Sequence, residues 1–147
     1  MAGSASVKYV RALALDKKLI THLGSMPFSA TGTRRLCMHD AASSPLHVMV
    51  VECVAGSSFP CHYHRDGDEV TTIVNGRMEI LIWDKGLSSS PTRLVLGNDE
   101  HDAKAAHIPR HTPHLTRPLG GNCVYMEVKV GPFDKDNLVV VKGGCPL

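Results

Sequence analysis

The sequence lacks three features that mark common functional classes. No apolar run approaches the ~20 residues of a membrane-spanning helix, since the longest are strand-length segments such as 48–51 and 139–141. No Lys/Arg cluster exceeds a pair and the formal net charge is +2, which argues against a nucleic-acid partner. No continuous apolar stretch precedes Asp16. We therefore expect no secretory signal and no membrane association.

Recognisable cysteine pairs are missing as well. The five cysteines are odd in number and widely spaced, and no Cys-x-x-Cys pair occurs among Cys37, Cys53, Cys61, Cys123 and Cys145. Disulfide frameworks of secreted domains use even numbers of cysteines at close spacing. We therefore expect free thiols, a reducing compartment and a cytoplasmic location.

Length and composition are those of one ordinary globular domain. The chain has 147 residues, of which 43% are hydrophobic and 20% charged, enough to bury a substantial core. We find no repeat and no linker. We expect a single domain at 1–147, with an N-terminal arm and helix at 1–30, a core at about 31–134 and a C-terminal tail at 135–147.

The residue patterns predict one short helix and many short strands. Residues 16–23 carry apolar side chains at three- and four-residue spacing, which is typical of a helix. Apolar runs bounded by Gly, Pro, Asp and Ser predict strands. Many short strands at close spacing favour an all-β sandwich or barrel. The predicted strands are 46–54, 58–64, 69–74, 77–83, 92–96, 104–108, 122–130 and 138–142.

The Asn75-Gly76 pair lies between two of these apolar runs. A type I′ turn needs positive φ at both central residues, and Asn-Gly is the pair that adopts it most readily. We therefore expect 69–74 and 77–83 to be antiparallel neighbours.

Histidine is unusually frequent, with nine residues in all. In a strand, His62 and His64 point to the same face, so both imidazoles can reach one ion. A turn through 65–68 is expected to bring Glu69 opposite them, so that three ligands converge from one hairpin. The complete pattern is Gly56-x5-His62-x-His64-x4-Glu69-x6-Gly76.

A second segment, 107–114, supplies a fourth candidate ligand. Pro109 and Pro113 restrict the turn that leads into His114. The four side chains together offer three nitrogens and one oxygen. That set suits one divalent transition metal ion (Fe, Zn, Mn, Ni or Cu) rather than Ca²⁺ or Mg²⁺. Because only neutral imidazoles bind metal, we expect the metal affinity to fall below about pH 6.5.

These two segments resemble the two motifs of the cupin superfamily, whose members are jelly-roll barrels that hold a metal ion on three His and one Glu. The resemblance implies an all-β, single-domain cupin jelly-roll barrel with a short N-terminal helix. It also implies that His62, His64 and Glu69 from the first motif and His114 from the second are the metal ligands. The first motif matches at every fixed position.

The second motif departs from the cupin pattern. His111 stands where cupins commonly have Gly, and Pro118 stands where Asn often follows the last ligand. His107 and His111 therefore remain alternatives to His114, or residues that lie next to the ligands.

A narrower resemblance is to the WbuC-type small cupin metalloproteins. It includes the Arg35 and His39 segment and, most specifically, the string Glu-Val-Lys-x-Gly-Pro-aromatic-Asp that begins at Glu127. Arg35, His39, Glu127 and Lys129 are thereby candidate substrate-binding residues. Glu127 and Lys129 share one strand face, which is either a solvated outer face or the lining of the barrel mouth. Cys37 departs from that family, as does the tail after residue 134. A weaker likeness, in 56–59 and 76–79, is to small diketone-cleaving dioxygenases.

Two functions are consistent with these residues. The first is a metal-dependent enzyme, of dioxygenase or isomerase type, that acts on a small oxygen-rich molecule such as a sugar derivative, an enol or a diketone. The alternative is a non-catalytic metal- or ligand-binding cupin, a sensor or accessory protein in a carbohydrate pathway. Metal-free sugar-nucleotide epimerases on the same fold lack this ligand set. We also expect a homodimer, because small open barrels leave edge strands and apolar faces to cover.

Overall fold

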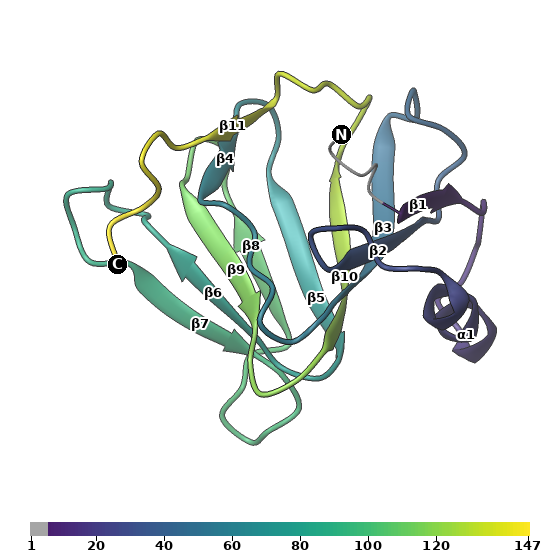
Figure 1. Ribbon diagram of the computed structural model, residues 1–147. Helices are drawn as coiled ribbons and strands as arrows, with labels where there is room; N and C mark the ends of the chain where they lie inside the picture. The colour runs from purple at the N-terminus through teal and green to yellow at the C-terminus, as the bar shows by residue number, and fades with distance from the viewer. Residues whose placement is uncertain (1–5) are drawn as a thin grey trace.

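Two β-sheets face each other across the interior of the molecule (Figure 1). The structure, a computed structural model, describes residues 6–147. One sheet has the strand order β1-β2-β3-β10-β5-β8 and the other β11-β4-β9-β6-β7. In these residues the elements are β1 (Ser6–Tyr9), α1 (Lys17–Ser25), β2 (Thr33–Cys37), β3 (Leu46–Cys53), β4 (His62–His64), β5 (Glu69–Asn75), β6 (Met78–Ile82), β7 (Thr92–Leu96), β8 (Ala105–Ile108), β9 (His114–Pro118), β10 (Cys123–Val130) and β11 (Leu138–Val140).

The predicted β-rich fold with one short helix is confirmed. Most of the eight predicted strands occur within two residues of their expected ends, although β4 begins only at His62. The strands β1, β2 and β9 were not predicted. Within residues 6–147 the two sheets do not close into a barrel, and their arrangement is consistent with a jelly roll.

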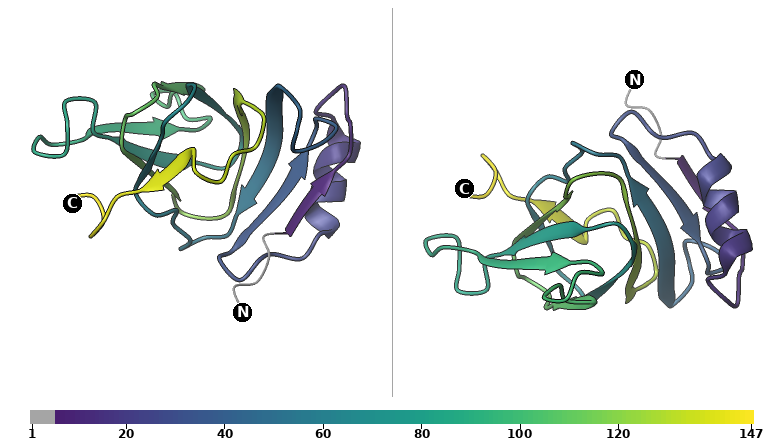
Figure 2. Two further views of the ribbon diagram at one scale, coloured as in Figure 1. Left: turned by 90° about the horizontal axis from the view of Figure 1, so that it is seen from above. Right: turned by 90° about the horizontal axis from the view of Figure 1, so that it is seen from below.

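Helix α1 lies on the outer side of the six-stranded sheet (Figure 2). Asp16 caps its first turn, because the Leu19 backbone N–H donates to the Asp16 carboxylate at 2.9 Å. Leu19 and Leu23 are buried against an outward-facing apolar cluster that includes Leu36, Val50 and Val124. No helix in the described part of the chain has the length and hydrophobicity needed to cross a bilayer.

The space between the sheets has an apolar end and a polar end. Because successive strand residues point to opposite faces, each inner face carries every second residue of its strands. The apolar end is closely packed by Met49, Val51, Ile73, Met78, Ile80, Ile82, Leu96 and Ile108, among others. The polar end holds the buried residues His62, His64, Glu69, Thr71, His114, Thr116 and Glu127. The polar side chains therefore lie in a confined space next to a closely packed apolar core.

The predicted hairpin at Asn75-Gly76 was wrong. Its two strands belong to different sheets, since β5 pairs with β10 and β8 whereas β6 pairs with β7 and β9. Gly76 has a φ of 77°, but Asn75 does not have the positive φ that a type I′ turn requires. A Cβ on Gly76 would lie 2.5 Å from the Asn122 carbonyl oxygen. Gly76 therefore allows the backbone to pass close to Asn122 where the chain crosses from one sheet to the other.

The expectation of five free thiols was also wrong, because Cys61 and Cys145 form a disulfide. The tail returns along β4, with β11 antiparallel to it, and the Val141 N–H donates to the Cys61 carbonyl oxygen at 2.9 Å. The Cα atoms of Cys61 and Cys145 are thereby brought to 5.6 Å across a sequence separation of 84. The other three cysteines are free and buried.

Removing this disulfide should destabilise the protein. A cross-link across 84 residues restricts the unfolded chain, and Cys145→Ser is expected to lower the free energy of unfolding by about 4 kcal/mol. Urea denaturation of the variant and of the oxidised wild type measures this difference. Reductant should lower the stability of the wild type by a similar amount and leave Cys145→Ser unchanged. A wild-type protein that does not respond to reductant would contradict the pairing.

Candidate metal centre

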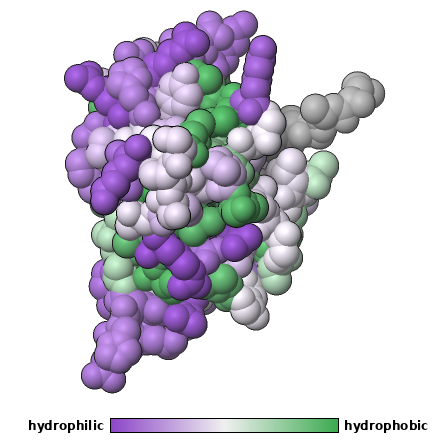
Figure 3. Space-filling model, turned by 90° about the vertical axis from the view of Figure 1, so that its left-hand side faces the viewer, coloured by the Kyte–Doolittle hydropathy of each residue, from purple (hydrophilic) through white to green (hydrophobic). Residues whose placement is uncertain are grey.

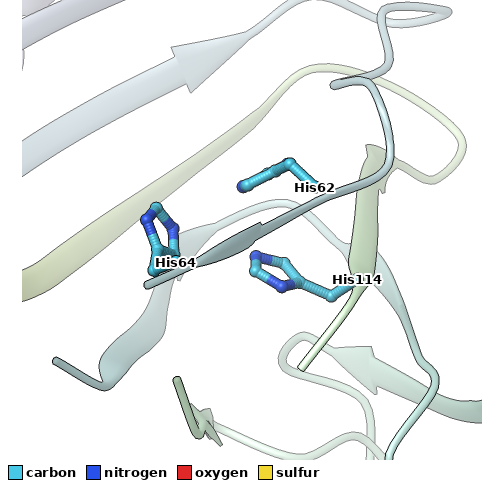
Figure 4. A group of neighbouring side chains, drawn as sticks. All are labelled: His62, His64 and His114. Atoms are coloured by element: carbon cyan, nitrogen blue, oxygen red, sulfur yellow. The ribbon is translucent and has the colours of Figure 1, made fainter. Parts of the chain in front are cut away.

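Three buried histidines meet at the polar end of the interior. His62 and His64 come from β4 and His114 begins β9. One ring nitrogen from each lies within 4.8 Å of the other two. Figure 4 shows the three imidazoles turned toward a common space. The structure thus brings together three of the four side chains that the sequence analysis put forward as ligands.

The strand geometry explains why these rings meet. His62 and His64 are both buried on one face of β4, with the less buried Tyr63 between them on the other face. Strand β4 pairs with β9 at the positions of His62 and His114. Directly opposed residues on neighbouring strands stand side by side, and the centroids of these two rings are 4.3 Å apart.

Two backbone carbonyls set the proton positions of the cluster. His62 Nδ1 lies 2.7 Å from the Pro60 carbonyl oxygen, and His114 Nδ1 lies 2.9 Å from that of Thr112. A carbonyl can only accept a hydrogen bond, so each Nδ1 carries the hydrogen and each Nε2 keeps its lone pair. This arrangement is typical of metal-binding histidines.

Burial lowers the pKa of two of the three histidines, His62 and His114. Burial, together with the neighbouring His114, lowers the pKa of His62 from 6.5 to about 4. Burial also lowers the pKa of His114. Protonation of His62 therefore begins at a lower pH than that of a free imidazole.

Glu69 lies beside the histidines but does not share a hairpin with them. The expected hairpin was wrong, since β4 belongs to the five-stranded sheet and β5, which Glu69 begins, to the six-stranded sheet. Glu69 instead approaches across the interior, with its carboxylate oxygen 2.9 Å from His64 Nε2. Thr71 Oγ1 donates to the other carboxylate oxygen at 3.2 Å. The carboxylate is thus at the edge of the three-nitrogen group.

This donor set fits a divalent transition metal. His114 Nε2 is buried and makes no hydrogen bond to any described residue, and His64 Nε2 lies close to the Glu69 carboxylate without the geometry of a hydrogen bond. Three neutral imidazole nitrogens with an adjacent carboxylate suit such an ion. Buried nitrogens without a partner cost free energy, and coordination of an ion would remove that cost.

The other two candidate histidines lie apart from this cluster. His107, on β8, is exposed, and its Nε2 is 2.7 Å from an Asp68 carboxylate oxygen. His111 is also exposed and has a φ of 62° in the turn before β9. Its backbone N–H donates to the His64 carbonyl oxygen at 2.7 Å. The geometry brings neither side chain into the three-nitrogen group.

A pocket opens beside the histidines, with an empty volume of about 420 Å³ including its mouth. Three of the four candidate substrate-binding residues line it, namely Arg35, Glu127 and Lys129. The face of β10 that carries Glu127 and Lys129 is therefore an inner face and not a solvated one. His39 does not line this pocket. Its ring stacks on that of His47, with centroids 4.1 Å apart.

The sequence analysis missed the contribution of the tail to this pocket. Leu138 of β11 lines it, as do Phe59 and Thr116. Residues 138–142 were predicted as a strand because they form a short apolar run, but nothing local in the sequence indicates that this strand lies next to β4. Tyr125, on the same face of β10 as Glu127, also lines the pocket and is buried.

Glu127 and Lys129 form an ion pair inside the pocket, with Lys129 Nζ 2.7 Å from a Glu127 carboxylate oxygen. Burial alone would raise the pKa of Glu127, but Lys129 and Arg35 outweigh it and lower that pKa from 4.5 to about 2. Glu127 is therefore a buried carboxylate held in its charged form by two cations.

Sequence comparison places the chain in a described family. A protein-family profile with the description "Domain of unknown function (DUF6016)" matches residues 18–92. No curated protein matches the sequence.

Solved structures with a similar fold are cupins. KdgF from Halomonas sp. is 21% identical with a TM-score of 0.53, covering 71% of this chain and 84% of that one. Oxalate oxidase in complex with glycolate is 14% identical with a TM-score of 0.59, covering 77% of this chain and 57% of that one. Oxalate decarboxylase from Bacillus subtilis is 16% identical with a TM-score of 0.59, covering 74% and 27%. The chain thus spans just over half of the oxidase and about a quarter of the decarboxylase. At these identities the likeness shows the fold.

Loss of the lysine in the pocket should destabilise the protein in a pH-dependent way. Lys129→Met leaves Glu127 buried without its ion-pair partner, and the free energy of unfolding at pH 7 should fall by about 3 kcal/mol. Because the pKa of Glu127 is lower in the folded protein than in the unfolded chain, its charge stabilises the fold at pH values above the unfolded pKa of 4.5. This contribution is lost as the pH falls toward the folded pKa of about 2.

The difference between Lys129→Met and the wild type should therefore narrow between pH 7 and pH 3. Urea denaturation at both pH values measures it. Lys85→Met, which changes an exposed lysine outside the pocket, is the control and should change little. An equal loss at both pH values would contradict the role of the Glu127 charge.

Proposed function

We propose that this chain, which belongs to the DUF6016 family, is a metal-dependent enzyme that acts on a small oxygen-rich molecule. The observation that supports this most directly is the cluster of His62, His64 and His114, whose nitrogens lie within 4.8 Å of one another beside a pocket. The family description assigns no activity, so the proposal rests on the site itself.

The proposed ligands are the three histidines and Glu69. Carbonyl contacts hold the rings of His62 and His114 with Nε2 free. Thr71 holds the Glu69 carboxylate. A divalent ion bound there would act as a Lewis acid toward a carbonyl or enediol oxygen and, in the case of iron, could also activate O₂.

The remaining pocket residues would bind and orient the substrate. Arg35, Lys129 and Glu127 offer charged hydrogen-bonding groups on the side of the six-stranded sheet. Phe59 and Leu138 supply apolar surface that would exclude water from one side of a bound molecule. A few convergent polar groups on an apolar lining are usual for small-molecule sites.

The resemblance to WbuC-type cupins forms part of this proposal. Its most specific segment supplies Glu127 and Lys129 to the pocket. The same segment continues into residues 131–134, and Pro132, Phe133 and Asp134 of it line a neighbouring pocket. Dioxygenase chemistry on an enol or diketone would require iron, whereas another metal would favour isomerase chemistry. A cytoplasmic location also remains a proposal.

The alternative is a non-catalytic metal- or ligand-binding protein, such as a sensor. In such a protein we would expect four protein ligands to complete the coordination of the ion and leave no open position. The charged pocket residues that are not candidate ligands, Arg35, Glu127 and Lys129, favour the enzyme.

We also propose that the chain forms a homodimer. The edge strands β1 and β11 carry exposed apolar residues, including Tyr9 at 45% and Val140 at 52% exposure. On the face seen in Figure 3, hydrophobic residues are visible mainly in the middle, while the two ends are mostly hydrophilic. Exposed edges and apolar residues favour association with a second chain.

Metal content tests the proposed function. Protein purified without a metal-affinity tag should contain close to one equivalent of a divalent transition metal by elemental analysis. His62→Ala and His114→Ala should each lose the metal and any turnover together. His107→Ala, which changes an exposed histidine outside the cluster, is the control and should keep both. The absence of metal from the wild type after reconstitution would overturn the proposal, as would turnover that persists without metal.

Light scattering tests the dimer. At micromolar concentration the wild type should have twice the mass of the chain, which is 15.9 kDa. A monomeric mass would refute the association.

A further inference from the structure

Arg35 is a mostly buried cation that interacts by charge with Glu127, yet its Nε atom has no hydrogen-bond partner among the described residues. Its Nε atom has no exposure to solvent and makes no hydrogen bond to residues 6–147. Its neighbour in the strand, Arg34, has partners for its whole guanidinium, with Nε 2.7 Å from Glu52 and one Nη 2.6 Å from the Met26 carbonyl oxygen. Buried donors are almost always paired. Arg34 thus has protein partners where Arg35 has none for its Nε atom, which makes Arg35 a candidate to bind a ligand.

The charges around Arg35 favour an anion. In the pocket, Arg35 and Lys129 are cations and Glu127 and Glu69 are anions, so their charges sum to zero. The proposed divalent ion would add two positive charges to this buried space. Uncompensated buried charge is costly, and a ligand that carries negative charge would neutralise it.

The position of Arg35 indicates where the anionic group would lie. Two pockets share the lining residues Arg35, His64, Lys129 and Leu138, namely the pocket beside the histidines and an adjoining one with an empty volume of about 530 Å³ including its open mouth. The adjoining pocket is bounded by the segment that contains Phe133 and Asn137. The guanidinium is therefore at the boundary of the two spaces, within reach of a ligand that occupies either one.

We propose that the pocket binds a small carboxylic acid as its anion, with the carboxylate on the guanidinium of Arg35 and a carbonyl or hydroxyl oxygen toward the three histidines. A guanidinium presents two parallel N–H groups that match the two oxygens of a carboxylate. Lys129 supplies a second positive charge on the same wall of the pocket. The position of the second oxygen rests on the proposed function, whereas the carboxylate contact does not require the metal.

The test uses three small acids, pyruvate, lactate and malonate, together with the neutral amide pyruvamide. Binding to the full chain is measured by calorimetry, and the Nε–H resonance of Arg35 is followed by NMR. At least one acid should bind and shift that resonance. Pyruvamide should bind at least tenfold more weakly than pyruvate if pyruvate is bound, because a guanidinium makes stronger hydrogen bonds to a charged carboxylate than to a neutral amide.

Variants locate the contact. Arg35→Gln should weaken acid binding at least tenfold. Arg35→Lys keeps the charge without the paired N–H groups and should give an intermediate loss. Arg110→Gln, which changes an exposed arginine outside both pockets, should bind like the wild type. The NMR measurement on the wild type keeps the test valid if Arg35→Gln does not fold.

Two results would overturn the inference. One is that none of the three acids binds or shifts the Arg35 resonance. The other is that a bound acid binds equally well to a folded Arg35→Gln variant. Metal content separates this test from that of the proposed function, because Arg35→Gln should keep the metal of the wild type. Carboxylate binding that depends on Arg35 in a protein without metal would refute the enzyme proposal and support the carboxylate contact.

Discussion

Each polar donor or acceptor buried without a partner between two β-sheets costs about 1–3 kcal/mol. At the polar end of this interior most such groups have partners. Backbone carbonyls accept from two of the three histidine rings, and Lys129 pairs with Glu127. The groups without a hydrogen-bond partner include nitrogens of His64, His114 and Arg35. The proposed ligands of the pocket, a metal ion and an anion, would lie against these three nitrogens.

Features that depend on local alternation could be predicted from the sequence. The two-residue period of a strand is enough to place His62 and His64 on one face, as the structure has them. The apolar strands and the helix were found in the same way, because their patterns repeat within a few residues. Pro109 and Pro113 of the second segment likewise indicated His114 as the residue that follows the turn.

Features that depend on distant parts of the chain could not be predicted. Strands β2 and β9 turn polar side chains such as Arg35, His114 and Thr116 inward, so they lack the apolar alternation that identifies a buried strand. Two of the strands that line the site were therefore missed. Whether a turn joins neighbours in one sheet or crosses between sheets depends on packing, as at Gly76 beside Asn122. The pairing of Cys61 with Cys145 and the position of Glu69 opposite the histidines also depend on this packing.

Strand β11, which borders β4 at the edge of the five-stranded sheet, is synthesised long after β4. Strand β4 has only three residues, and β11, which borders it, begins more than 70 positions further along the chain. Until the ribosome has released β11, one edge of the strand that carries His62 and His64 is open. Because contacts between distant segments form slowly, the three histidines should reach their final arrangement only after the tail has been translated.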